Sequence, residues 1–173
     1  AQSAVATGFS VDDSCRYNRP DNPDLSRTPG SDGNREVFTV SCWIKRCNLS
    51  SYQPLWSTTG NNWADFKSDD TLRVACGNST GNRTTDRKFN DVGAWMHFVF
   101  RIDTTQEDAA DRLRIYINGV EETSFSASVA VAEDFETDMN WTGAVFDVLN
   151  DGGGSRTLDG YAAEFVLLDG TAA

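Results

Sequence analysis

Two tryptophans that stand beside asparagines are the residues of this chain best suited to binding chemistry. Trp63 follows Asn61 and Asn62, and Trp141 follows Asn140, with turn-forming residues around both groups. An exposed indole ring can stack on the apolar face of a pyranose sugar, while amide groups hold the sugar hydroxyls. These five residues form the candidate carbohydrate-binding set. The open alternative is that Trp63 folds inward as part of the core.

The only histidine, His97, limits the scope for nucleophilic catalysis of the Ser-His-Asp type. It lies among Trp95, Met96 and Phe98, a setting typical of a half-buried structural histidine with a hydrogen-bond partner. The segment NDGGGS at residues 150–155 lacks the Gly-Lys-Ser/Thr ending of a phosphate-binding loop, so we expect an inter-strand loop there. No catalytic residue is predicted.

Calcium is the metal that the acidic residues of the chain would suit, because it prefers carboxylate oxygens. None of these residues falls in a recognisable ligand motif, so we predict no metal site and no cofactor. Solvated loops are their expected role, and calcium stays an open alternative. The residues concerned are Asp69, Asp70, Glu133, Asp134, Glu136, Asp138 and Asp151.

The four cysteines do not show the spacing of a zinc site. Cys42 and Cys76 lie in alternating apolar segments and are expected to be small core residues. Cys15 and Cys47 lie in polar sequence, where a disulfide between them would tie down the N-terminal segment. Free thiols are the alternative if the protein assembles in a reducing cytoplasm.

Charge and length restrict the class of protein. The formal net charge is −11, so a polyanion would be repelled and we expect no nucleic-acid partner. No apolar run approaches the roughly 20 residues that span a bilayer, and the first residues lack a signal-peptide pattern. We therefore expect no membrane insertion. The 173 residues fit a single domain, 1–173, in which 1–24 hold a first strand around Phe9 and an extended segment.

Residues 94–120 carry the strongest secondary-structure pattern. Met96, Phe98 and Phe100 alternate with polar or smaller residues, which is the period of a half-buried strand. Residues 113–117 repeat the pattern, and the following Asn118-Gly119 pair is typical of a type I′ hairpin turn. This segment indicates two antiparallel strands joined to a third by a tight turn.

Comparable alternation along the chain predicts an all-β fold, a two-sheet antiparallel jelly-roll sandwich with about ten to twelve short strands. Residues 77–87 are polar and are expected to form a loop. The residues expected to be buried between the sheets are Phe38, Val40, Ile44, Phe98, Phe100, Ile115, Ile117 and Phe165.

Four ordered motifs make the chain resemble the concanavalin A-like, laminin-G-like jelly-roll domains of tailed-phage virion surface proteins. They extend from about residue 25 to 170. The resemblance implies the twisted two-sheet jelly roll of legume lectins, pentraxins and laminin G modules. The motifs are LSRTP (25–29) with GNR (33–35), FTVSCWIKR (38–46), AWMH (94–97) with DTTQ (103–106) and RIYINGV (114–120), and LDGYAAEF (158–165) with LDG (168–170).

The resemblance implies a non-enzymatic protein of the virion surface, an appendage, fibre or capsid decoration, assembled in the host cytoplasm. Its expected partners are other virion proteins, further copies of itself, with a trimer expected, and a host cell-surface glycan. One alternative is a capsid-stabilising protein without a glycan ligand.

A secreted polysaccharide-active enzyme is the disfavoured alternative. Glucanases of the same fold carry Glu-x-Asp-x-(x)-Glu on one strand, which supplies the paired carboxylates that glycoside hydrolysis needs. The chain lacks this motif. Glu164 stands alone in its strand, and Glu121 and Glu122 follow a hairpin turn.

Overall fold

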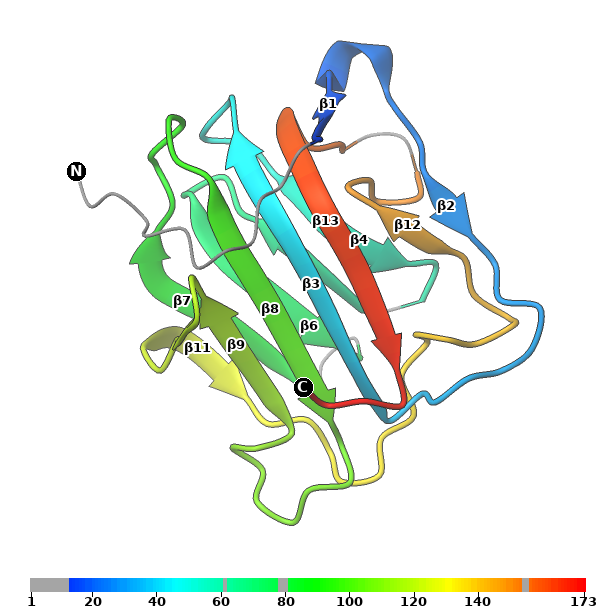
Figure 1. Ribbon diagram of the computed structural model, residues 1–173. Coiled ribbons are helices and arrows are strands. Elements are labelled where there is room, and N and C mark those ends of the chain that lie inside the picture. The colour runs from blue at the N-terminus through cyan, green and yellow to red at the C-terminus, as the bar shows by residue number, and fades with distance from the viewer. Residues whose placement is uncertain (1–12, 61, 78–80, 154–155) are drawn as a thin grey trace.

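The chain forms two antiparallel β-sheets that pack face to face (Figure 1). The computed structural model describes residues 13–60, 62–77, 81–153 and 156–173. This architecture confirms the predicted all-β jelly-roll sandwich. The six-stranded sheet has the order β1 (Cys15–Tyr17), β13 (Gly160–Asp169), β3 (Val37–Arg46), β8 (Met96–Asp103), β9 (Leu113–Ile117), β10 (Val120–Glu121). The seven-stranded sheet has the order β11 (Phe125–Val129), β7 (Asn82–Lys88), β6 (Thr71–Cys76), β5 (Asn62–Phe66), β4 (Gln53–Thr58), β12 (Phe146–Val148), β2 (Ser26–Arg27).

Helix is almost absent from the described part of the chain. It contains one short 3-10 turn, η1 (Arg19–Asp21). In the same residues, no helix is long and apolar enough to cross a membrane.

The core lies between the sheets and is built from alternate residues of the strands. Seven of the eight residues expected there are buried, from Phe38 on β3 to Ile117 on β9. The eighth, Phe165, is only half-buried although it packs against the core. A β-bulge between Ala163 and Val166, with Glu164 at φ 49°, interrupts the alternation of β13 at this point.

The hairpin that joins β9 to β10 confirms the predicted turn. Ile117 pairs with Val120, so Asn118 and Gly119 are the two residues of the loop. Both have positive φ, 53° and 78°, as a type I′ turn requires.

Two segments expected to be loops contain strands. Residues 77–87 were expected to be a polar loop, but β7 covers most of this segment. The prediction was wrong because β7 has no apolar alternation. Its inward Thr85 is buried and accepts a hydrogen bond from the Leu72 backbone at 3.1 Å instead. Similarly, the N-terminal loop contains β1, which pairs with β13. The strand expected around Phe9 lies outside the described residues.

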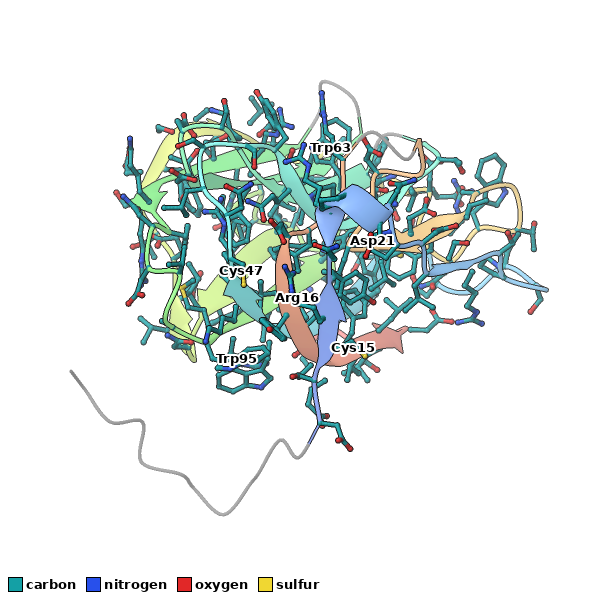
Figure 2. The ribbon with its side chains drawn as sticks, turned by 90° about the horizontal axis from the view of Figure 1, so that it is seen from above. Cys15, Arg16, Asp21, Cys47, Trp63 and Trp95 are labelled. Carbon is teal, nitrogen blue, oxygen red and sulfur yellow. The ribbon has the colours of Figure 1, made fainter. Side chains whose placement is uncertain are left out.

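The cysteines divide as the sequence indicates. Cys42 and Cys76 are buried, and Cys15 and Cys47 are exposed, all four as free thiols. β13 lies between β1, which carries Cys15, and β3, which ends just before Cys47 (Figure 2). Two strand spacings amount to about 10 Å, beyond the roughly 7 Å limit for the Cα atoms of a disulfide. A Cys15–Cys47 bridge is therefore incompatible with this arrangement.

Candidate functional site

A pocket of about 260 Å³ lies on the outer face of the seven-stranded sheet. Strand alternation creates its floor. On β5, Ala64 and Phe66 are buried between the sheets, so Trp63 and Asp65 project from the opposite face. Arg73 on β6 pairs directly with Asp65 and therefore shares that face. Trp63 and the exposed Trp95 lie on opposite sides of the sandwich (Figure 2). The lining residues are Pro54, Ser57, Thr58, Trp63, Asp65, Arg73, Asp151 and Arg156.

The loop that follows β12 supplies one wall of the pocket. Asn150 and Thr157 form an isolated antiparallel bridge, and the Asp151 backbone N–H donates to the Arg156 carbonyl at 3.1 Å. The Asp151 carboxylate accepts a hydrogen bond from the Gly153 backbone at 3.3 Å. These contacts hold Asp151 and Arg156 beside the sheet, although they lie far from β5 in the sequence.

Arg73 is fixed in the pocket by an ion pair and by two aromatic rings. Its Nε and Nη2 donate to the two carboxylate oxygens of Asp65, at 3.0 and 2.7 Å. Its guanidinium carbon lies 5.3 Å from the ring centre of Trp63 and 5.8 Å from that of Tyr52. The guanidinium carbon of Arg156 lies 4.7 Å from the centre of the same Tyr52 ring. Guanidinium groups and aromatic rings thus alternate along the pocket.

The pocket combines the groups that bind a sugar. Burial raises the pKa of Asp65, an effect that Arg73 opposes by hydrogen bonding and by its charge. Carboxylate oxygens accept and guanidinium groups donate. The hydroxyls of Ser57 and Thr58 donate to the Asn150 and Asn62 carbonyls, so their remaining lone pairs can accept. Trp63 adds an aromatic surface. These are the functions that hold sugar hydroxyls and the apolar face of a sugar ring.

Of the four predicted binding residues that the structure describes, only Trp63 lines this pocket. Asn62 is buried, donates to Asp138 at 3.1 Å and accepts from the Gly77 backbone, so it connects loops. Asn140 is also buried and donates to Asp169 at 3.1 Å. These contacts engage both asparagines within the fold, away from the pocket. Asn61 lies outside the described residues.

Trp141 lies elsewhere, in the loop between β11 and β12. Its side chain is 37% exposed, and the guanidinium carbon of Arg35 lies 5.1 Å from its ring centre. Gly143 lies against the ring, where a Cβ atom would come within 2.4 Å of it. Trp141 does not line the pocket, so the structure does not combine the two tryptophans into one site.

The acidic residues considered for calcium are mostly engaged in the fold. Within the described ranges, no group of three or more His, Cys, Asp or Glu side chains is arranged to hold a metal ion. The contacts are Asp69 with Lys67 and Thr71, Asp70 with Arg46, Glu133 with Arg112, Glu136 with Arg35, and Asp138 with Asn62.

His97 is half-buried on the outer face of the six-stranded sheet. Its Nε2 lies 2.8 Å from the Ser41 Oγ, and its ring stacks on Trp43 with centroids 4.8 Å apart. Burial lowers the pKa of His97. A neutral imidazole that is hydrogen-bonded to a hydroxyl and stacked on an indole stabilises this face of the sheet.

Asp147 is a buried carboxylate close to the pocket. It pairs across the sheet with Ser57, is 3% exposed, and its Oδ2 has no hydrogen-bond partner among the described residues. Burial raises the pKa of this carboxyl, and the nearby charges of Asp24 and Asp151 raise it further. The folded state therefore binds a proton more readily than the unfolded chain, so stability is lost as pH rises from the unfolded pKa through the folded one.

Asp147→Asn is expected to raise the free energy of unfolding at pH 7, because the amide stays neutral where the carboxylate must ionise. The advantage should shrink toward about pH 3, below the ordinary aspartate pKa of about 3.9. Urea unfolding of both proteins at pH 3, 5 and 7 measures it. Asp24→Asn, at an exposed neighbour, is the control and should stabilise less. A variant less stable than wild type at pH 7 would contradict the prediction.

Comparison with known proteins agrees with the two-sheet fold. The profile of the concanavalin A-like lectin/glucanases superfamily matches residues 22–171. No curated protein sequence is significantly similar to the chain. The solved structures described next are each below 25% identical to the chain, so they show the fold alone.

Three solved structures resemble the chain in fold, with TM-scores from 0.54 to 0.61. Domains LG4-5 of the mouse laminin alpha1 chain give a TM-score of 0.61 at 11% sequence identity. The match covers 99% of this chain and 48% of the laminin chain. Domain 4 of AbnA, an extracellular arabinanase of Geobacillus stearothermophilus, in complex with arabinotriose, gives a TM-score of 0.56 at 16% sequence identity. The match covers 96% of this chain and 87% of that domain. The native heptameric SAP-like pentraxin of Limulus polyphemus gives a TM-score of 0.54 at 17% sequence identity. The match covers 84% of this chain and 70% of the pentraxin chain.

The two-sheet architecture and the match over residues 22–171 lead to one assignment. The chain belongs to the concanavalin A-like lectin/glucanases superfamily, as a laminin-G-like domain.

Proposed function

We propose that this domain is a non-enzymatic carbohydrate-binding module whose ligand is a neutral oligosaccharide, held in the pocket beside Trp63. The observation that carries the proposal is the alternation of guanidinium groups, carboxylates and aromatic rings around that pocket. A sugar ring offers both hydroxyls and an apolar face, so it can use all of these groups at once.

The charges of the pocket favour a neutral sugar over an acidic one. Arg73 is already paired with Asp65, and Arg156 lies 4.0 Å from the Asp151 carboxylate. The lining therefore offers two positive and two negative groups, and Asp147 lies close by. The chain as a whole carries a formal net charge of −11. A carboxylate on the sugar would meet this negative field without an unpaired cation to compensate for it.

The same contacts argue against glycoside hydrolysis. An acid catalyst must deliver a proton to the glycosidic oxygen, and a nucleophile must present a free carboxylate oxygen. Both oxygens of Asp65 accept hydrogen bonds from Arg73, and Asp151 Oδ1 accepts from the Gly153 and Arg156 backbone. The Asp147 carboxyl is buried, at 3% exposure, and does not line the pocket. Binding without cleavage is the role that this arrangement supports.

The relatives give independent support for sugar binding. Domain 4 of AbnA was solved with arabinotriose, and the present chain covers 87% of that domain. We extend this ligand class, an oligosaccharide, to the present chain as part of the proposal.

A panel of oligosaccharides of matched length tests the proposal, with neutral sugars in one arm and uronic acids in the other. Nuclear magnetic resonance of the ¹⁵N-labelled protein follows the Trp63 indole and the backbone of β4 and β5. We expect neutral sugars to shift these signals with a Kd of about 1 mM, about 4 kcal/mol, and acidic sugars to bind more weakly. Stronger binding of the acidic arm, or shifts confined to other surfaces, would contradict the proposal.

We also propose the virion surface of a tailed phage as the setting, on the strength of the sequence motifs alone. Weak single sites would then act through many copies, by multivalency. Mass spectrometry of purified particles should find the chain at high copy number. Particles that contain the chain, lose integrity without it, and bind no glycan would favour the capsid-stabilising alternative.

A further inference from the structure

The two sheets have four edge strands in the described part of the chain, β1 and β10 on one sheet and β2 and β11 on the other. Three of these edges carry charge. Arg16 lies on β1, Arg27 on β2 and Glu121 on β10. Charged side chains on an edge strand prevent its unpaired backbone groups from joining another strand. These three edges are therefore protected against further pairing.

β11 has no such protection. Residues 123–132, TSFSASVAVA, contain no charged residue, in a chain of which 24% is charged. β11 pairs with β7 on one side and is the outermost strand of its sheet (Figure 1). Its residues from Ser126 to Val129 are exposed, and Val129 is 49% exposed. Five residues make it longer than any of the other three edges.

The chemistry of this edge selects its partner. A net charge of −11 makes copies of the chain repel one another, so an uncharged surface favours a contact between copies over an acidic one. A two-fold contact places the same strand opposite itself, and like charges opposite each other in a sheet destabilise it. Of the four edges, only β11 meets its own copy without bringing side chains of like charge into the paired region.

The acidic residues that flank β11 are partly neutralised within the chain. Glu121 lies 3.5 Å from Arg114, and Glu133 lies 2.9 Å from Arg112. These ion pairs reduce the repulsion where the ends of two β11 strands would meet. The remaining repulsion should be screened by salt.

We propose that two copies of this chain associate through antiparallel pairing of their β11 strands, which joins their seven-stranded sheets into one continuous sheet. Backbone hydrogen bonds between the two strands supply the specificity. The proposal does not depend on the sugar pocket, which lies over β4, β5 and β6 of the same sheet.

Sedimentation velocity across protein concentration tests the proposal, at low salt and at about 0.5 M salt. The wild-type chain should form a dimer that is stronger at high salt, since screening weakens the repulsion between copies. Val129→Lys should weaken dimerisation at least about tenfold, because a charged side chain on an edge strand opposes its pairing with another strand. Val120→Lys on β10, which is 70% exposed, is the matched control and should leave the dimer unchanged.

Hydrogen exchange gives a second measurement that does not depend on the variants. The amides of β11 should become more protected as protein concentration rises, while those of β2 should not. A wild-type chain that stays monomeric at about 1 mM in high salt would overturn the proposal and leave an extended peptide as the occupant of this edge. A dimer that Val129→Lys leaves intact in a folded protein would also overturn it.

Discussion

Replacing Trp63 with alanine is expected to abolish measurable oligosaccharide binding while leaving the sandwich folded. Trp63 is the aromatic surface of the pocket and is only half-buried, so its side chain is not part of the core between the sheets. Loss of about 80 Å² of apolar contact with a sugar, at about 25 cal/mol per Å², costs about 2 kcal/mol, or about thirtyfold in Kd. A millimolar site would then fall below detection.

Trp141→Ala is the matched control for this prediction. The substitution is the same, the side chain is 37% exposed, and it lies in a loop outside the pocket. The control should bind oligosaccharide as the wild type does, by the same magnetic-resonance titration. Circular dichroism and thermal unfolding check that both variants are folded. Equal loss of binding in the two variants, or retained binding in Trp63→Ala, would show that the pocket is not the site.

The outcome for the paired asparagines shows where sequence reasoning about this site fails. Asn62 and Trp63 are neighbours in the sequence, and this suggested one binding unit. They lie on a strand, however, where successive side chains point to opposite faces. Trp63 therefore reaches the outer pocket while Asn62 turns toward Asp138. Proximity along a strand is a poor guide to shared chemistry, whereas the same alternation correctly predicted seven of the eight named core residues.

The charged residues of the pocket were missed for a different reason. In the sequence, Asp65 and Arg73 look like ordinary surface charges on two strands. Only the register of the β5–β6 hairpin places them opposite each other. The short connection at residues 67–70 was a signal that could have set this register. Asp151 and Arg156 had no such signal, because a long-range contact brings their loop to the sheet.

Replacing the buried Arg46 is expected to destabilise the protein more than any other single change considered above. Arg46 is fully buried, and its Nη2 donates to Asp70 at 2.9 Å while its Nη1 donates to the Phe89 carbonyl at 2.8 Å. Its guanidinium carbon lies 4.4 Å from the centre of the Phe66 ring. Burial lowers the pKa of Arg46, and the hydrogen bond and charge of Asp70 oppose that shift.

Arg46→Met should lower the free energy of unfolding by about 3 to 5 kcal/mol, because it leaves the Asp70 carboxylate nearly buried without its cation. Urea unfolding measures the loss. The double variant Arg46→Met/Asp70→Asn should lose less than the sum of the two single variants, since it removes both charges together. Asparagine tolerates the positive φ of 65° at position 70, so the turn is preserved. A cost below about 1 kcal/mol for Arg46→Met, or additive losses in the double variant, would mean that the ion pair does not stabilise the sandwich.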